Sequence, residues 1–347
     1  MGKKWLYWIV GGLAAALFGV YAPHSAAAAT NQQAVPLRVA PVLNQYQATQ
    51  AKSYFDLEMA PGQSTEMAFK LGNVSDQPIE VSVTVAAAAT GDNAQIDYSG
   101  GNKHYDESLA YPMPTLVSIP KAYQHIKIPA NQTATYHVPL KMPTAKLAGY
   151  LLGQINIRPT KTKAAKGAVT NTYSYGIGVR LSNGSTTLPA LKSPGKATLT
   201  HSIVNTQVNA TLQNPKQSAL RNGKLEATVT KQGQNRVLKS VTFNSSTVAP
   251  NSRFTVKVPW TGAIAPGDYT MHMVYNSTDP SFDSAQTWKF TKNFHVSAIQ
   301  AAQYTLANYR VPWWVYAIVI VILLLLIVII ILLLRRRKEA QTSEDQA

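Results

Sequence analysis

The feature that most constrains this chain is an unbroken apolar run near its C-terminus, from Trp313 to Leu334. As a helix rising about 1.5 Å per residue, the run reaches roughly 33 Å, enough to cross the hydrocarbon core of a bilayer. We therefore expect a transmembrane helix at 312–334 and a basic cytoplasmic tail at 335–347. The residues predicted to lie at the membrane interface are Trp313, Trp314, Tyr316, Arg335, Arg336, Arg337 and Lys338.

The N-terminus has the pattern of a secretory signal peptide over residues 1–29. Two lysines precede an apolar run from Trp5 to Val20, and Ala27 and Ala29 fit an A-x-A cleavage site before Thr30. The alternative, an N-terminal anchor, is less favoured because the small-residue site follows the run directly. Together the two ends predict a single-pass type I membrane protein whose bulk lies outside the cell.

The chain contains no cysteine. Exported domains in oxidising compartments commonly use disulfides, so their absence suggests the cell wall of a Gram-positive bacterium. Outside the membrane, nucleic acid is not expected as a partner.

Between the two ends the pattern is β nearly throughout. Apolar and polar residues alternate at 80–85, 225–230 and 253–258, and Gly, Pro, Asn and Ser clusters interrupt at short intervals. This spacing is typical of sandwiches. No amphipathic helical pattern longer than about two turns is expected outside the terminal segments. The fold class is therefore all-β, with two tandem immunoglobulin-like β-sandwich domains.

A weak internal repeat supports two copies of one module. The stretches NQTATYHVPL from Asn131 and NSRFTVKVPW from Asn251 align Val138 with Val258 and Pro139 with Pro259. A turn containing Pro precedes each stretch and a Gly-initiated strand follows it. The predicted order after the signal peptide is a first sandwich at 30–185, a linker at 186–196, a second sandwich at 197–298, a stalk at 299–311, and the membrane helix and tail.

The chain resembles the WxL-interacting protein family of low-GC Gram-positive bacteria. The resemblance is carried by YFDLEMAPGQ from Tyr54, by the segments 70–100 and 149–157, and by 248–275 and 287–296 in the second half. It implies a peptidoglycan-binding first domain and a second domain linked to host surface or matrix proteins. It also implies partnership with secreted WxL-domain proteins.

Catalytic signatures are absent from the sequence, which has no G-x-S-x-G elbow, HExxH or phosphate loop. Asp56 and Glu58, two residues apart on a predicted strand, have the spacing of a glycosidase acid pair. Phe55, Leu57 and Met59 alternate with them, so we expect the carboxylates to form a solvated strand face. The histidines show no metal-ligand spacing, and no metal or cofactor is expected. One alternative is a loop cation site, formed by Asp92, Asp97, Asp106 and Glu107.

The net charge of the exterior region suggests what kind of surface it binds. Once the signal peptide and tail are left out, 26 basic residues face 13 acidic ones. Anionic wall polymers and peptide-stem carboxylates fit this excess, although it would also serve solubility. Candidate wall-binding residues are three lysines of a predicted loop and three tyrosines of the region 91–114, namely Lys161, Lys163, Lys166, Tyr98, Tyr105 and Tyr111.

The function expected from these observations is a non-enzymatic, membrane-anchored surface scaffold or adhesion protein. It would bind peptidoglycan or anionic wall polymers, WxL-domain proteins and possible host matrix ligands. Protein recognition is assigned to the second sandwich, whose edge strands can accept another chain. On the final predicted strand, 286–296, the aromatic face of Trp288, Phe290 and Phe294 is expected to be core. The alternatives are a wall-active glycan hydrolase and a surface receptor subunit, for which the tail is short.

Overall fold

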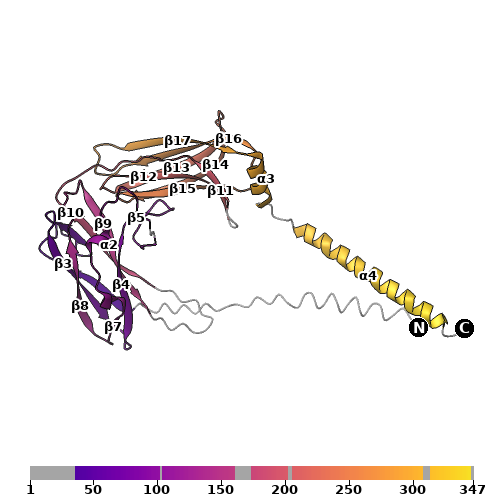
Figure 1. Cartoon of the computed structure of the whole chain (residues 1–347), viewed down its shortest axis with the longest axis horizontal. Helices are drawn as coiled ribbons and strands as arrows, with labels where there is room; N and C mark the ends of the chain where they lie inside the picture. Colours follow the sequence, from indigo (N-terminus) through magenta and orange to yellow (C-terminus); the bar gives the residue numbers. More distant parts are fainter. Residues whose placement is uncertain (1–35, 102–103, 161–172, 202–204, 308–312, 345–347) are drawn as a thin grey trace. The chain divides into compact units, whose positions relative to one another are not determined.

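The computed structural model describes residues 36–101, 104–160, 173–201, 205–307 and 313–344 (Figure 1). The predicted signal peptide lies outside these residues. The described chain is mostly β, as expected, with two sandwiches followed by two helices.

The first sandwich packs a three-stranded sheet against a five-stranded one. The first sheet has the order β1 (Leu37–Val42), β3 (Ser64–Asn73) and β8 (Thr133–Lys141). The second has the order β2 (Phe55–Glu58), β10 (Tyr175–Ser182), β9 (Tyr150–Pro159), β4 (Ile79–Ala87) and β7 (Ile126–Ile128). Between β4 and β7 lie β5 (Ala89–Thr90), β6 (Ile96–Asp97), α2 (Met113–Leu116) and the 3-10 turn η1 (Lys121–Gln124).

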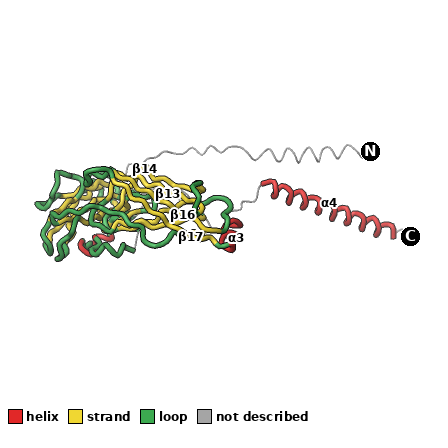
Figure 2. The backbone as a smooth tube through the Cα atoms, turned by 90° about the horizontal axis from the view of Figure 1, so that it is seen from above, coloured by secondary structure: helices red, strands yellow, loops and turns green. Residues whose placement is uncertain are grey.

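The second sandwich has three strands facing four. One sheet has the order β11 (Thr198–His201), β12 (Thr206–Asn214) and β15 (Ser252–Pro259). The other has the order β14 (Val237–Val248), β13 (Leu220–Lys231), β16 (Gly267–Ser277) and β17 (Gln286–Val296), and these four strands lie side by side in Figure 2.

The two sandwiches share one strand order. Strands β10, β9, β4 and β7 correspond to β17, β16, β13 and β14, and β8 corresponds to β15 at the edge of the three-stranded sheet. The repeated stretches identified in the sequence form β8 and β15, where Val138 and Val258 are both fully buried. The alignment of these residues therefore reflects equivalent places in the two folds.

Each sandwich also contains the same buried asparagine contact. Asn73 at the end of β3 and Asn214 at the end of β12 are 2% and 0% exposed, and the side-chain amide of each ties together two loops of its own sandwich. The acceptors are the carbonyls of Gln77 and Ile128 in the first sandwich and of Ser218 and Ala249 in the second, at 2.7 and 3.1 Å in both cases. Because an unpaired buried amide is costly, these contacts fix the turn that leads into β8 or β15.

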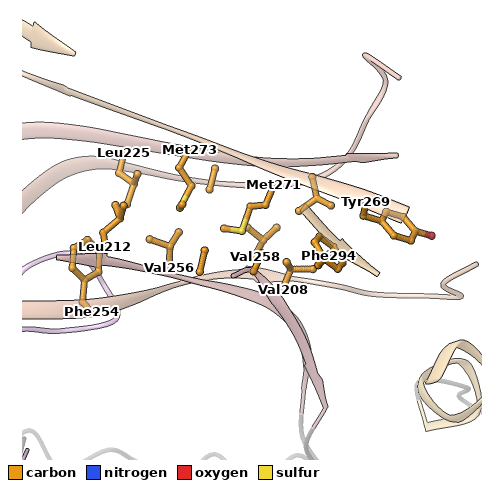
Figure 3. Packing of buried hydrophobic residues seen from close by; sticks show 14 of the residues in the cluster. Val208, Leu212, Leu225, Phe254, Val256, Val258, Tyr269, Met271, Met273 and Phe294 are labelled. Carbon is orange, nitrogen blue, oxygen red and sulfur yellow. The ribbon is translucent and has the colours of Figure 1, made fainter. Parts of the chain in front are cut away.

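The core of the second sandwich lies between its two sheets. Figure 3 shows Leu225, Met271 and Met273 from β13 and β16 pointing toward Val256 and Val258 of β15. These residues are fully buried. The alternation read in the sequence therefore places one face of each strand in the core, as the period of two requires.

The expectation of no helix longer than two turns in the exterior is wrong, because α3 spans Ala298–Ala307. Ser297 and Gln300 form a reciprocal cap, in which the Ser297 hydroxyl accepts from the Gln300 amide and the Gln300 side chain accepts from the Ser297 amide. Ala301 is 4% exposed and belongs to the core of the second sandwich. The S-x-x-Q signal at 297–300 would have predicted this helix start.

Candidate functional site

The paired carboxylates of β2 have different environments, and the expectation of a solvated face is wrong for Asp56. β2 runs parallel to β10 with Asp56 opposite Arg180, and the Arg180 guanidinium donates to the Asp56 carboxylate at 2.7 Å. Asp56 is 2% exposed, whereas Glu58 faces solvent. The Arg180 guanidinium also lies 4.4 Å from the centre of the Tyr150 ring. Asp56 is therefore engaged in a structural ion pair, which leaves it poorly placed for acid–base chemistry.

The predicted wall-binding residues are only partly described. Lys161, Lys163 and Lys166 follow β9 and precede β10, an antiparallel pair, and lie outside the described residues. Of the three tyrosines, Tyr105 is exposed, and Tyr98 and Tyr111 are half-buried. Burial raises the pKa of the Tyr98 hydroxyl. Among the three tyrosines, Tyr105 therefore offers the most accessible ring.

The region that carries these tyrosines also contacts the second sandwich, which the sequence did not predict. Ala94 is fully buried within the core cluster of that sandwich. Its carbonyl accepts hydrogen bonds from the Thr247 amide at 2.9 Å and the Ser246 hydroxyl at 3.0 Å. The Thr90 hydroxyl lies 2.6 Å from that of Ser252. This part of the first sandwich therefore contributes to the packing of the second.

Asp106 carries the most heavily bonded carboxylate of this contact. Its oxygens accept from the side-chain amide of Gln213 at 2.9 and 3.0 Å, from the amide and hydroxyl of Ser108, and from the Arg253 guanidinium. Burial alone would raise the pKa of Asp106, but the hydrogen bonds from Ser108, Gln213 and Arg253 outweigh it and hold the pKa below its usual value. The carboxylate is thus kept ionised between the sandwiches.

The acidic residues proposed as a cation loop are engaged by other side chains of the chain, and Glu107 lies 3.7 Å from the same Arg253 that binds Asp106. Asp106 is engaged as above, Asp92 pairs with Lys257, and Asp97 accepts from Ser99. Within the described ranges, no three His, Cys, Asp or Glu residues are grouped to hold a metal ion.

A second set of hydrogen bonds joins the two sandwiches through Gln217. Its side-chain oxygen accepts from the Ala148 amide at 2.6 Å, and its carbonyl accepts from the Tyr150 amide at 2.8 Å. The Tyr150 hydroxyl in turn accepts from the Ala219 amide at 2.8 Å. The segment predicted as a linker at 186–196 also bonds to the second sandwich, where Leu191 lies in the core and Lys192 bridges to Gln213.

The first sandwich carries an open groove of about 630 Å³. Its floor is the pair formed by the start of β3 and the end of β8, and its wall is the segment 114–118. The groove offers the Glu66 carboxylate, the Lys141 ammonium and several hydroxyls, and His137 Nδ1 lies 3.4 Å from Glu66. None of its lining residues carries an aromatic ring.

The aromatic face of β17 is core, as expected, but incompletely covered. Phe294 is 8% exposed, while Trp288 and Phe290 are half-buried and pack against the core of the second sandwich. Trp288 makes edge contacts with Tyr275 and Phe282, with ring centres 6.0 and 5.9 Å apart.

The final helix, α4, spans Trp313–Glu344. Its stretch Trp313–Leu333 has a mean hydropathy of 3.8, is not buried against the protein, and is long and apolar enough to cross a membrane. Trp313, Trp314 and Tyr316 are exposed at its start, and Arg335 to Lys338 lie in its last part. Among the described residues this is the one helix with that property.

Comparisons with known proteins agree with this architecture. Two family models match in order: the peptidoglycan binding domain of WxL Interacting Proteins over 37–159, and their host binding domain over 164–305. A search of curated proteins found no match.

Solved structures with similarity to the chain include chaperones. The class 5 fimbriae chaperone CfaA is 9% identical with a TM-score of 0.31, covering 74% of this chain and 99% of its own. The CsuC–CsuE chaperone–tip adhesion subunit complex of Acinetobacter baumannii is 14% identical with a TM-score of 0.30, covering 66% and 92%. The two ordered family matches, which span most of the chain, identify it as a member of the WxL-interacting protein family.

Proposed function

We propose that this chain is a non-enzymatic scaffold that holds WxL-domain proteins at the wall of a Gram-positive cell. The observation that carries the proposal is the succession of a peptidoglycan-binding domain, a host-binding domain and an apolar C-terminal helix in one chain. The first sandwich binds the wall, the second binds proteins, and α4 retains both at the membrane. Ligands on a host or matrix surface would meet the second sandwich.

The wall contact is proposed to combine the loop lysines with the exposed Tyr105 ring. Each exposed ion contact contributes only about 0–1 kcal/mol, so attachment is weak individually, multivalent and sensitive to salt. The groove beside Glu66 and Lys141 is the competing location within the same sandwich.

The test is a pull-down of the full chain, in detergent micelles, with purified peptidoglycan across a salt series. Changing Lys161, Lys163 and Lys166 together to Ala should weaken binding about tenfold at low salt and flatten the salt dependence. The control changes three other exposed lysines of the first sandwich, Lys70, Lys121 and Lys127, and should have a smaller effect.

Three results would change this picture. Loss of binding only in Glu66→Gln and Lys141→Gln would move the site to the groove. Loss only in Tyr105→Ala would make the lysine loop a bystander. Release of glycan or peptide products by the purified chain, abolished in Glu58→Gln as well as in a folded Asp56→Asn variant, would replace the scaffold by a hydrolase.

The proposal also implies a membrane topology, in which the predicted region 30–311 lies outside the cell and the tail at 335–347 lies inside. In sealed cells stripped of wall, added protease should digest the region 30–311 and spare the tail at 335–347. Digestion of the tail from outside would refute a type I arrangement and with it the retention of the scaffold by α4.

A further inference from the structure

The equivalent sheet edges of the two sandwiches, at β10 and at β17, differ in whether another strand pairs with them. In the first sandwich, β2 pairs in parallel with β10 over the register Val179↔Phe55 to Ser182↔Glu58, and it covers the edge of the five-stranded sheet. In the second sandwich, β17 occupies the place of β10. Among the described strands, β16 alone pairs with β17, so the opposite edge of β17 is open.

The chain has no comparable length to cover this edge from the corresponding position. Residues 43–63 separate β1 from β3, and β2 forms within them. Only residues 202–205 separate β11 from β12, which is too few for a strand that crosses to the other sheet at about 3.3 Å per residue. The segment before β11 lies near the later half of β17 through a side chain, because Lys292 Nζ donates to the carbonyl of Gly195 at 2.9 Å. The earlier half, 286–291, is the open stretch.

The side chains of that open stretch resemble those of β10 in the first sandwich, but they have no strand equivalent to β2 beside them. In β10, Val179 and Leu181 are buried beside Phe55 and Leu57, which are fully buried, and outward-facing Arg180 is neutralised by Asp56. In β17, the corresponding inner residues Trp288 and Phe290 remain half-exposed.

Among the described residues, one charged side chain on the outer face of β17 has no partner. Thr287, Thr291, Asn293 and His295 all bond to side chains of β16, with His295 Nδ1 2.7 Å from Asp268. Lys289 is exposed and makes no hydrogen bond or ion pair with the described residues. An added strand with apolar residues facing inward and an acidic residue facing outward would cover both aromatics and neutralise Lys289.

We propose that the edge of β17 at Gln286–Thr291 receives a strand from a WxL-domain protein, added in parallel and alternating apolar–acidic–apolar as β2 does. The inference rests on the proposed function and names the site and chemistry of its protein partner. A second copy of this chain fits poorly, since pairing two β17 edges would bring two uncompensated Lys289 side chains together in an already basic exterior.

The experiment uses the full chain in detergent micelles and the WxL-domain proteins secreted by the same cells. On binding, hydrogen exchange should slow in the peptide 286–291. It should change little in β14, the strand at the opposite edge of the same sheet. Lys289→Glu should weaken binding about fivefold, whereas Lys121→Glu, the same charge change on the first sandwich, should leave it near wild type.

Orientation is tested by cross-linking, which the absence of native cysteine makes clean. Thr287→Cys and Thr291→Cys are each labelled with a short cross-linker, and the partner peptides are mapped. A parallel strand requires the site reached from 287 to lie N-terminal to the site reached from 291. The reverse order would overturn the parallel strand.

Failure of this inference is distinguishable from failure of the scaffold. Binding that persists in Lys289→Glu at full strength without protection of 286–291 would overturn the β17 site and leave the scaffold intact. Self-association that protects 286–291 without WxL protein would assign the edge to a second copy. The absence of any WxL-protein binding would refute both proposals.

Discussion

Replacing Asp106 by alanine removes the carboxylate on which the two sandwiches converge. The Gln213 amide, which is 5% exposed, loses both acceptor contacts, and the Arg253 guanidinium loses its ion pair. Removing one partner of a buried pair costs about 3–5 kcal/mol. Because the Arg253 side chain is about half exposed (48%) and regains water, we take the lower end, about 3 kcal/mol, as the expected loss in the free energy of unfolding.

The assay uses the distribution of tryptophan. The first sandwich has none, Trp260 and Trp288 lie in the second, and Trp313 and Trp314 begin α4. Because the two α4 residues lie outside both sandwiches, we expect the cooperative change in emission on heating to follow the second sandwich, while far-ultraviolet circular dichroism follows both. For domains of this size, about 3 kcal/mol corresponds to a fall in Tm of about 6–12 °C. In Asp106→Ala the emission transition should move to lower temperature and, if the contact couples the sandwiches, separate from the dichroism transition.

The variant Glu107→Ala is the matched control. Its carboxylate lies 3.7 Å from Arg253 and is 83% exposed, so its loss should be near neutral. Asp106→Asn keeps the shape of the side chain and separates charge from volume. A fall in Tm below about 2 °C in Asp106→Ala would refute the reasoning, as would equal effects at 106 and 107.

Stability should also depend on pH through this residue. The pKa of Asp106 in the folded chain lies below its ordinary value of 3.8. Its contribution is therefore fully present only well above the unfolded value of 3.8 and is lost as pH falls through the lower, folded value. The stability difference between wild type and Asp106→Asn should shrink in that acidic window.

Three other substitutions test further buried polar contacts. Asp56→Ala should lower the free energy of unfolding in urea by about 3 kcal/mol, because it leaves the Arg180 guanidinium without its carboxylate partner. Glu58→Gln should be near neutral. Similar losses at both positions would contradict the ion pair. Asn73→Ala and Asn214→Ala should each cost about 2–3 kcal/mol, because each leaves loop carbonyls unpaired. The transition followed by tryptophan emission should shift mainly in Asn214→Ala, because Asn214 lies in the second sandwich. An equal shift in both variants would show that the two asparagines do not stabilise their sandwiches independently.

The local pattern along the chain was sufficient for the strand faces and the long apolar helix, although the expectation drawn from it missed α3. Alternation with a period of two determines which residues of a strand share a face, so Val256 and Val258 could be assigned to one core face directly from the sequence. The apolar run at 313–334 likewise needs no tertiary information, because its length and composition alone suit a bilayer. The repeat of β8 in β15 was visible because equivalent positions in one fold impose similar residues.

Tertiary structure alone decided what lies beside each exposed face and edge. Asp56 follows the alternation of a solvated face, yet it is buried because β10, 124 residues away, places Arg180 against it. The tyrosine-rich region resembled a free surface loop, but part of it packs into the second sandwich through Ala94 and Asp106. Neighbours this distant in sequence leave no periodic signal, since strand order is set by which sheets close over a common core. For the same physical reason, the open edge of β17 becomes visible only beside its covered counterpart, β10.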